Sequence, residues 1–559
     1  MKKLAALFTS LCIVPTIAPA VATAEPPRLV LQITVDGLRA DMLPRYRENF
    51  VADGFNYLLN NGAVYTNAHY LHANTETIVG HATLATGATP AVHGMVGNVW
   101  YNGDTGELGY NIEDPAAPIL PTRDVIKAGA QIDPAQKRSG AAGRSPRSIL
   151  VPTFSDTLAI SSEGQARVFG ISGKDRSAVA MAGKTGTAYW YSTDTGDFQT
   201  SAYYMDQYPQ WVSDWNQQRK AERLAGTEWQ LLLERDRYRP GRIDDRPYEV
   251  DLKGYGRVFP HAYGDPEHPL FFTRVMVSPA GDDLLLDFGK QLIEAEDIGA
   301  DTITDYLSIS FSGVDAVNHF FGPASIENED VVLRLDRTLA ELFDFIDERI
   351  GLDQTLIVLS ADHGMAEMPE FASEMGYATQ RIYGDQLLAI ARKHADELYG
   401  TEDIVRDFFR PYFYLDADLL RKKKLDRNTV ASKLAARLSQ EDGIGSAIAG
   451  NTIDTAIEGT GTAAILHNQH PQRSGDIYIY QAPYGFILER GAVAAMHGSP
   501  WRYDSHVPII FAGAGIGSDT VNRRVHPIDV APTLSAFMQL VSPAGAKGSI
   551  LPEVIPPRP

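Results

Sequence analysis

Cysteine is almost absent from this sequence, because its 559 residues contain only Cys12. That residue lies in a leader, residues 1–24, that we expect to be removed. The remaining chain, residues 25–559, then has no thiol, which excludes disulfide bonds, a cysteine nucleophile and a thiolate metal site. Any metal ion must therefore be held by His, Asp and Glu side chains.

The leader has the pattern of a signal peptide. Lys2 and Lys3 form a basic start, an apolar stretch runs from Leu4 through Val21, and Ala-Thr-Ala at 22–24 fits the small-x-small cleavage rule. A membrane anchor is the alternative, but two prolines interrupt the apolar stretch, which is short for a membrane span. We therefore predict a periplasmic or secreted protein without a stable membrane anchor after cleavage.

Positive charge is scarce. The chain has 50 Lys and Arg against 70 Asp and Glu, and its formal charge of −20 becomes −22 when Lys2 and Lys3 leave with the leader. Such a surface repels nucleic acids and anionic membranes, so we expect no nucleic-acid partner. It also repels phosphate esters. A site for them would need strong local positive charge, and metal ions are an economical source.

Hydrophobic periodicity indicates an α/β fold. Three segments are typical of buried strands, Leu29–Val35, Tyr306–Ser312 and Thr355–Ser360, and Val507–Ala512 is a fourth. Between the second and third strands, an apolar stripe from Val332 to Ile350 predicts a helix. A strand, a helix and a strand in succession are typical of a mostly parallel sheet, in which ligands bind at the carboxyl ends of the strands.

The chain is longer than a usual single domain, which favours a large core with insertions, or two domains. Two stretches, at about 180–290 and about 370–485, break the rhythm of strands and helices. We interpret both as insertions that crown the sheet within one α/β domain of residues 25–559.

Acidic and histidine residues follow the predicted strands. Asp315 and His319 are four positions apart, so one helical turn would direct both at a single point. Singly, an Asp after a strand is more often a helix cap or a turn residue than a metal ligand. Together they form a nitrogen and oxygen ligand set suited to Zn²⁺. The full set is Asp36, Asp315, His319, Asp362, His363 and His497.

Thr77 precedes a helix of small and apolar residues. A hydroxyl at a helix N-terminus faces the positive end of the helix dipole, which favours an alkoxide and then a phosphate. The alternative is a simple N-cap role, which Asn74 or Thr75 could equally fill. The local sequence leaves these readings open.

Thr77-Ile-Val-Gly80-His81, followed by Asn98 at 21 positions after the threonine, resembles the alkaline phosphatase superfamily branch that includes nucleotide pyrophosphatases and phosphodiesterases. The resemblance extends from about residue 28 to residue 513. It implies an alkaline phosphatase-like fold, a mostly parallel central sheet with helices on both faces and crown insertions. It also implies two Zn²⁺ per chain: Asp315, His319 and His497 for one, and Asp36, Thr77, Asp362 and His363 for the other.

Lys174 and Arg176 point to one branch. The segment Ser172–Ser177 resembles the Lys-x-Arg motif of phosphate-irrepressible alkaline phosphatases, which implies that both side chains bind phosphate oxygens, together with Asn98. A monoester dianion carries one more negative charge than a diester, so extra cations favour it. A solvated surface turn is the alternative for an isolated motif of this kind. His497 is preferred over His506 because a glycine follows it, as in the family's ligand.

The resemblance therefore implies an enzyme that hydrolyses small-molecule phosphate monoesters in two in-line displacements, with Thr77 as the covalent nucleophile. A phosphodiesterase or nucleotide pyrophosphatase with the same two metals is the main alternative, and Trp190, Trp211 and Trp215 in the first insertion are compatible with a base-binding slot. A non-catalytic phosphate- or metal-binding protein is the second, although pure binding needs no nucleophile beside the metals.

Overall fold

The computed structural model describes residues 26–102, 106–123, 132–239, 243–450, 461–491 and 493–555. The predicted leader lies outside the described residues. Within the described ranges, no helix combines the length and the apolar character that crossing a membrane requires.

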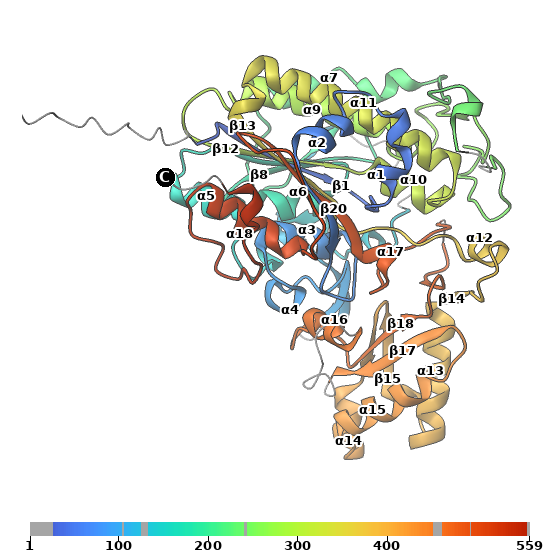
Figure 1. Ribbon diagram of the computed structural model, residues 1–559. Helices are drawn as coiled ribbons and strands as arrows, with labels where there is room; N and C mark the ends of the chain where they lie inside the picture. Colours follow the sequence, from blue (N-terminus) through green and yellow to red (C-terminus); the bar gives the residue numbers. More distant parts are fainter. Residues whose placement is uncertain are drawn as a thin grey trace, which may run out of the picture.

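In the described part of the chain, a nine-stranded sheet of order β21-β2-β20-β13-β1-β12-β7-β8-β9 runs through the body of the molecule (Figure 1). Strands β13, β1, β12, β7 and β8 are parallel neighbours, whereas β20 is antiparallel to both β13 and β2. In sheet order the bounds are Asp519–Val521, Ala63–His69, His506–Gly513, Thr355–Ser360, Leu29–Val35, Asp305–Phe311, Val168–Ser172, Thr187–Tyr191 and Phe198–Gln199.

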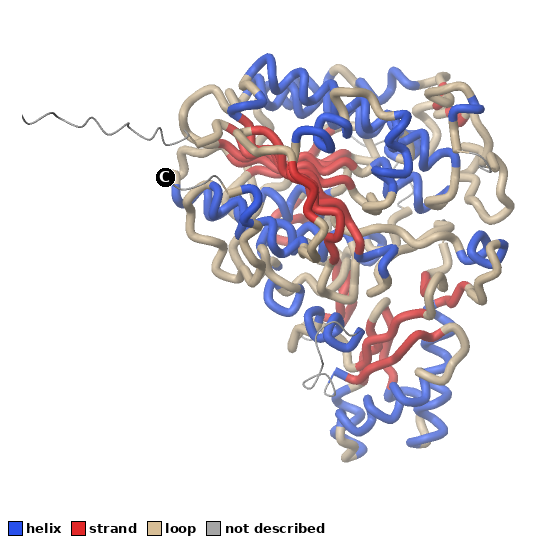
Figure 2. Tube along the Cα trace, in the orientation of Figure 1, coloured by secondary structure: helices blue, strands red, loops and turns tan. Residues whose placement is uncertain are grey.

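Helices cover both faces of this sheet, as Figure 2 shows by the blue helices on either side of the red strands. One face carries α9 and α11, and the other carries α3, α5, α6 and α18. The bounds of these helices are Pro279–Ala295, Ile326–Arg349, Thr77–Thr86, Phe154–Ser161, Asp175–Ala182 and Val530–Phe537.

The alternation of side chains along β1 explains the two helical layers. Leu31 and Ile33 pack in the same cluster as Leu335 of α11. Val30 points the other way and packs in the cluster that contains Leu84 of α3. Each of these side chains is fully buried, and full burial of one such side chain is worth about 1.5–3 kcal/mol. A strand with two apolar faces is therefore stable only between two layers.

The predicted fold class is confirmed: the protein is α/β, with a mostly parallel central sheet between helices. The four predicted strands coincide with β1, β12, β13 and β20 to within one residue at each end, and the predicted helix falls in α11. The sequence patterns did not indicate β7, which lies beside β12. The stretch near 180–290 contains β8, β9 and α9, which are part of the sheet and of one helical layer.

A lobe lies beside the body, drawn in orange in Figure 1. We call residues 381–488 the inserted lobe, of which 451–460 are not described. Its described residues form a sheet of order β15-β16-β18-β17, with the bounds Val405–Phe409, Tyr412–Leu415, Ile477–Gln481 and Ile444–Ala449. Helices α13, α14, α15 and α16 accompany it, with the bounds Gly384–Tyr399, Ala417–Lys423, Arg427–Leu438 and Gly461–Asn468. The lobe has its own apolar core.

Candidate active site

Neighbouring parallel strands bring the predicted site residues to one edge of the sheet. Strands β13, β1, β12 and β7 lie side by side and run in the same direction. Helix α10 (Gly313–Phe321) follows β12 and carries Asp315. In sheet order, the residues that follow these strands are Asp362 and His363, Asp36, Asp315, and Lys174.

Asp315, His319 and His497 form one group of potential metal ligands. His319 Nε2 lies 3.3 Å from Asp315 Oδ2, and His497 Nε2 lies 3.7 Å from Asp315 Oδ1. Backbone carbonyls orient both rings, since His319 Nδ1 pairs with Ala495 O and His497 Nδ1 with Thr75 O, each at 2.8 Å. The ligand atoms of the three residues lie within 4.8 Å of one another, so one ion can contact all three.

Asp36, Asp315 and His363 form a second group, also with ligand atoms within 4.8 Å of one another. His363 Nε2 lies 3.3 Å from Asp36 Oδ1 and 3.4 Å from Asp362 Oδ2. The rings of His363 and His497 stack with centroids 3.5 Å apart. Asp315 belongs to both groups, so the two potential metal positions share a carboxylate.

The chemistry of this cluster fits divalent cations. The carboxylates of Asp36, Asp315 and Asp362 are fully buried. Among the described residues, Lys174 is the cation that contacts Asp36 and Asp315, and its Nζ lies 2.7 Å from Asp36 Oδ2. Burial would lower the pKa of His363, but Asp362 and Asp36 outweigh it and raise this pKa to about 9. Three buried carboxylates so close together are costly without neighbouring cations, which Lys174 and a protonated His363, or a metal ion, can supply.

Unsatisfied polar atoms support the same conclusion. Asp315 Oδ1, Asp362 Oδ2 and His363 Nε2 are buried and make no hydrogen bond. Ion-pair contacts of 3.2–3.7 Å reach them from neighbouring groups of the cluster. Carboxylate oxygens and imidazole nitrogens that converge in this way are the ligands that zinc prefers when thiolates are absent.

Burial and charge separate the pKa values in the cluster. Burial, together with the charges of Asp315 and Asp362, raises the pKa of Asp36 above its ordinary 3.8. Burial would also raise the pKa of Asp315, but His319 and Lys174 outweigh it and hold this pKa well below 3.8. Burial and the neighbouring His363 lower the pKa of His497 well below 6.5. Neutral imidazole is the form that binds a metal ion.

Thr77 begins helix α3 and is 1% exposed. The N-cap position belongs to Glu76, so Thr77 does not cap this helix. Gly80 allows α3 to approach the end of β13, because a Cβ there would lie 2.0 Å from the carbonyl oxygen of Asp362. His81 Nδ1 lies 2.8 Å from Thr77 O and 3.2 Å from Asp362 Oδ2. The Thr-x-x-Gly-His spacing therefore places the first turn of α3, which carries Thr77, against the carboxylate cluster.

Arg176 and Asn98 contact the start of α3. Arg176 Nη2 donates a hydrogen bond to Thr77 Oγ1 at 3.3 Å, and Asn98 Oδ1 accepts one from the second N–H of α3 at 3.3 Å. Arg176 Nη1 is held by Asp133 Oδ2 at 2.7 Å. Arg176 Nε is buried and makes no hydrogen bond with the described residues, so the guanidinium keeps donor capacity for an anion.

A cavity of about 360 Å³ lies over these groups. Its polar lining includes Asn98, Lys174, Arg176, Asp315, His319 and His497. Its apolar lining includes Ile132, Met276, Val277, Phe409 and Met496. A lining of both kinds suits an anionic group attached to a less polar remainder.

The structure separates the two histidines that precede or begin β20. His497 lies in the cluster and is 4% exposed. His506 instead stacks on His69, with ring centroids 4.5 Å apart, and its Nε2 lies 3.0 Å from Thr66 O. His506 therefore has no place among the potential ligands.

The site also contains charged residues that the sequence patterns did not single out. Asp133 holds Arg176, as described above. Glu76 Oε2 accepts a hydrogen bond from Asn98 N at 2.6 Å, and Arg410 Nη2 donates to Glu76 Oε1 at 2.8 Å. The position of Glu76 directly before Thr77 is a usable signal, whereas Asp133 and Arg410 are distant in sequence and carry none.

Comparisons with known proteins agree with this geometry. The family described as type I phosphodiesterase / nucleotide pyrophosphatase matches residues 30–500. Alkaline phosphatase PhoV of Synechococcus elongatus is 31% identical over 95% of this chain and 94% of its own length. Alkaline phosphatase PafA of Elizabethkingia meningoseptica is 31% identical, with the same coverage of 95% and 94%.

Solved structures of PafA extend the likeness to three dimensions. The crystal structure of wild-type PafA matches with a TM-score of 0.86 at 29% identity, over 95% of this chain and 100% of that chain. Another solved structure is of a PafA variant in which a threonine, an asparagine, a lysine and an arginine are all changed.

Proposed function

The chain belongs to the type I phosphodiesterase / nucleotide pyrophosphatase family and is a phosphoric monoester hydrolase of the alkaline phosphatase type, and from this premise we propose a specific mechanism. In this proposal the protein is an exported, zinc-dependent alkaline phosphatase that cleaves small-molecule phosphate monoesters through a phosphothreonine at Thr77. The observation that carries the proposal is the hydrogen bond from Arg176 to Thr77 beside the buried carboxylate and histidine cluster.

Thr77 acts as the nucleophile in the first displacement. Its Oγ1 gives up its proton and forms a bond to phosphorus while the bond between phosphorus and the ester oxygen breaks, and the leaving oxygen takes up a proton. In the second displacement, water attacks phosphorus and gives up a proton, the Thr77 oxygen leaves and takes up a proton, and inorganic phosphate is released. Arg176, Lys174 and Asn98 bind the remaining phosphoryl oxygens and hold them in line for both steps.

Two Zn²⁺ per chain are the cofactors that this proposal requires. Asp315, His319 and His497 would hold one, and Asp36, Thr77, Asp362 and His363 the other, with Asp315 close enough to contact both. When bound, zinc lowers the pKa of a hydroxyl or water and stabilises the charge on a leaving oxygen.

The variant of PafA gives these roles further support. Its changed threonine and asparagine are 21 positions apart and its changed lysine and arginine are two apart. Thr77 and Asn98, and Lys174 and Arg176, have the same spacings in this chain. Asn98, Lys174 and Arg176 line the cavity here, and Arg176 donates a hydrogen bond to Thr77 at the start of α3.

A phosphodiesterase is the second candidate, and the apolar side chains of Phe409 and Met496 in the cavity lining favour it because a diester has a second organic group to bind. The deciding measurement is kcat/KM of the zinc-loaded enzyme for para-nitrophenyl phosphate and for its methyl ester, which share a leaving group. We expect the monoester to be preferred. A higher kcat/KM for the diester would replace the monoesterase proposal by the second candidate.

Export is the remaining part of the proposal. It is supported by the basic start, the apolar stretch and the Ala-Thr-Ala site of residues 1–24. N-terminal sequencing of the mature protein should begin near Glu25. Recovery of the full leader in the cytoplasmic fraction would contradict export without bearing on the catalytic mechanism.

A further inference from the structure

The inserted lobe places one arginine in the active site. Strands β15 and β16 form an antiparallel hairpin that pairs Phe409 with Tyr412, and Arg410 lies in the turn between them. Arg410 lines the cavity over the metal ligands, together with Phe409. The remaining cavity residues named above come from the body or from the segment that follows the lobe. The tip of this hairpin is therefore where the lobe meets the reaction site.

Arg410 makes two buried contacts there. Its Nη2 donates to Glu76 Oε1 at 2.8 Å, and its Nη1 donates to the carbonyl oxygen of His497. The side chains of Arg410 and Glu76 are 12% and 2% exposed. Removing one partner of such a pair leaves the other charge unpaired in a poorly solvated place.

Glu76 in turn holds the residues that surround the nucleophile. Its Oε2 accepts hydrogen bonds from Asn98 N at 2.6 Å and from Asn74 Nδ2 at 3.3 Å. Its backbone carbonyl accepts the N–H of Gly80 at 3.0 Å in the first turn of α3. Glu76 also precedes Thr77 directly and lines the cavity. The carboxylate therefore positions Asn98, while its own charge faces the space where an anionic substrate would bind.

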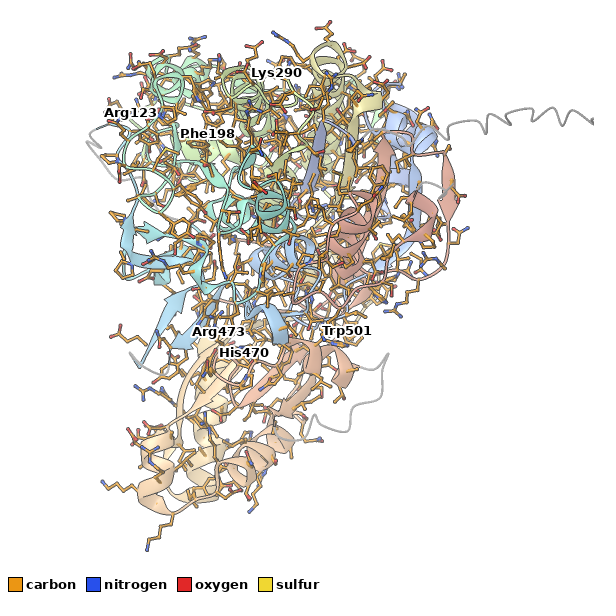
Figure 3. All side chains as sticks on the ribbon, turned by 90° about the vertical axis from the view of Figure 1, so that its left-hand side faces the viewer. Arg123, Phe198, Lys290, His470, Arg473 and Trp501 are labelled. Atoms are coloured by element: carbon orange, nitrogen blue, oxygen red, sulfur yellow. The ribbon has the colours of Figure 1, made fainter. Side chains whose placement is uncertain are left out.

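Contacts outside the hairpin also hold the lobe against the body. Figure 3 labels Arg473 and Trp501 where the lobe meets the body. Arg473 Nη1 donates to the carbonyl oxygens of Gly94 and Ser148, both at 2.7 Å. Trp501 Nε1 donates to the carbonyl oxygen of Gln481 in β18 at 3.0 Å. These contacts join the lobe to the body at two further places.

We infer that Arg410 is a positioning residue for phosphate-ester hydrolysis, which the inserted lobe supplies to neutralise and orient Glu76. The inference rests on the proposed function, because it assumes an anionic substrate in the cavity. Without Arg410, the unpaired carboxylate of Glu76 repels the phosphoryl group and no longer holds Asn98 in place. Substrate binding should suffer more than the chemical step, because the nucleophile and the metal ligands keep their side chains.

The test compares Arg410→Ala with Arg406→Ala, a matched control on β15 of the same hairpin. Arg406 lies outside the cavity, where it pairs with Asp416 at 3.8 Å and is 41% exposed. For Arg410→Ala we expect KM for para-nitrophenyl phosphate and Ki for inorganic phosphate to rise together by at least about tenfold, a change typical of repulsion between like charges at a binding surface. Arg406→Ala should leave both constants unchanged.

A second change separates positioning from a merely structural role. Adding Glu76→Gln to Arg410→Ala removes the unpaired charge but keeps an oxygen for the Asn98 N–H. We therefore expect the double variant to recover most of the lost phosphate affinity. If KM and Ki rise in Arg410→Ala and the double variant shows no recovery, the inference is overturned. It is also overturned if Arg410→Ala behaves like Arg406→Ala.

The conservative variant covers the case in which Arg410→Ala does not fold. Arg410→Lys keeps the charge but not the fork that bridges Glu76 and His497. Its KM should therefore lie closer to that of the wild type than to that of the alanine variant. If the alanine variant does not fold, the rise in KM of the lysine variant should stay below the change of about tenfold expected for loss of the charge. A Lys variant whose KM and Ki rise by about tenfold or more, although the positive charge is kept, would overturn the inference. A wild-type enzyme without monoesterase activity would contradict the proposed function instead, and it is measured first.

Discussion

Arg176 Nη2 lies 3.3 Å from Thr77 Oγ1, to which it donates a hydrogen bond. The guanidinium therefore touches the proposed nucleophile before any substrate is bound, while Asp133 holds its other side at 2.7 Å. A phosphoryl group bonded to Oγ1 would place its oxygens against the same fork. Arg176 can thus orient the Thr77 hydroxyl and then stabilise the negative charge on the phosphoryl oxygens.

Substitutions of Thr77 should distinguish the contribution of its hydroxyl to catalysis from the contribution of the surrounding residues. Thr77→Ala should abolish phosphothreonine formation and lower turnover by at least about a thousandfold, as removal of a covalent nucleophile does in other hydrolases. Thr77→Ser should keep measurable activity, because the hydroxyl remains. Rapid acid quench with labelled substrate, followed by peptide mapping, locates the phosphoryl group. Label on another residue, or unchanged kcat/KM in the alanine variant, would disprove the assignment.

The two cations in the cavity lining, Lys174 and Arg176, should favour monoesters selectively. A charge-assisted hydrogen bond is worth about 1.5–3 kcal/mol, and about 1.4 kcal/mol corresponds to tenfold in rate. Replacing Lys174 and Arg176 by Ala should therefore reduce kcat/KM for the monoester by roughly a hundredfold more than for its methyl ester, although the two effects need not be additive. Equal losses on both substrates would mean that the pair positions any phosphate alike.

Metal content gives a prediction that follows from the shared carboxylate. The wild type should bind two Zn²⁺ per chain and lose activity with a chelator. Asp315→Asn should reduce binding at both positions, because the Asp315 carboxylate belongs to both ligand groups. His319→Ala should weaken one position alone. Elemental analysis after gel filtration measures both, and full activity at one metal or none would refute the two-zinc mechanism.

Glu249 should make stability depend on pH away from the active site. Burial, together with the charge of Glu327, raises its pKa from 4.5 to about 8. The folded chain then holds a proton that the unfolded chain releases near pH 4.5, so this contribution to stability is full below 4.5 and is lost as pH rises through about 8.

Glu249→Gln tests whether this contribution to stability falls as pH rises. Its melting temperature relative to the wild type should rise between pH 5 and pH 8, by on the order of one degree or more. Glu267→Gln, at an exposed position, is the matched control and should show no such trend. Thermal unfolding followed by circular dichroism is sufficient. A difference that stays constant or falls with pH would contradict the raised pKa.

The sequence by itself determined the framework of the fold. β1, β12 and β13 were predictable because each is an apolar run that ends at a polar residue, and hydrophobic periodicity is a local property. The same pattern placed Asp36, Asp315 and Asp362 at strand ends, where a parallel sheet gathers them at one edge. Their roles as zinc ligands stay predictions.

Tertiary structure alone decided how these residues meet. It showed that β7 lies beside β12 and so brings Lys174 to Asp36 and Asp315, and that His497 enters the cluster while His506 does not. No local pattern encodes the pairing of Arg410 with Glu76, which are 334 positions apart. That contact depends on the docking of a separately packed lobe against the body. Docking is decided by the fit between two folded surfaces, and the residues that flank a motif in the sequence do not report that fit.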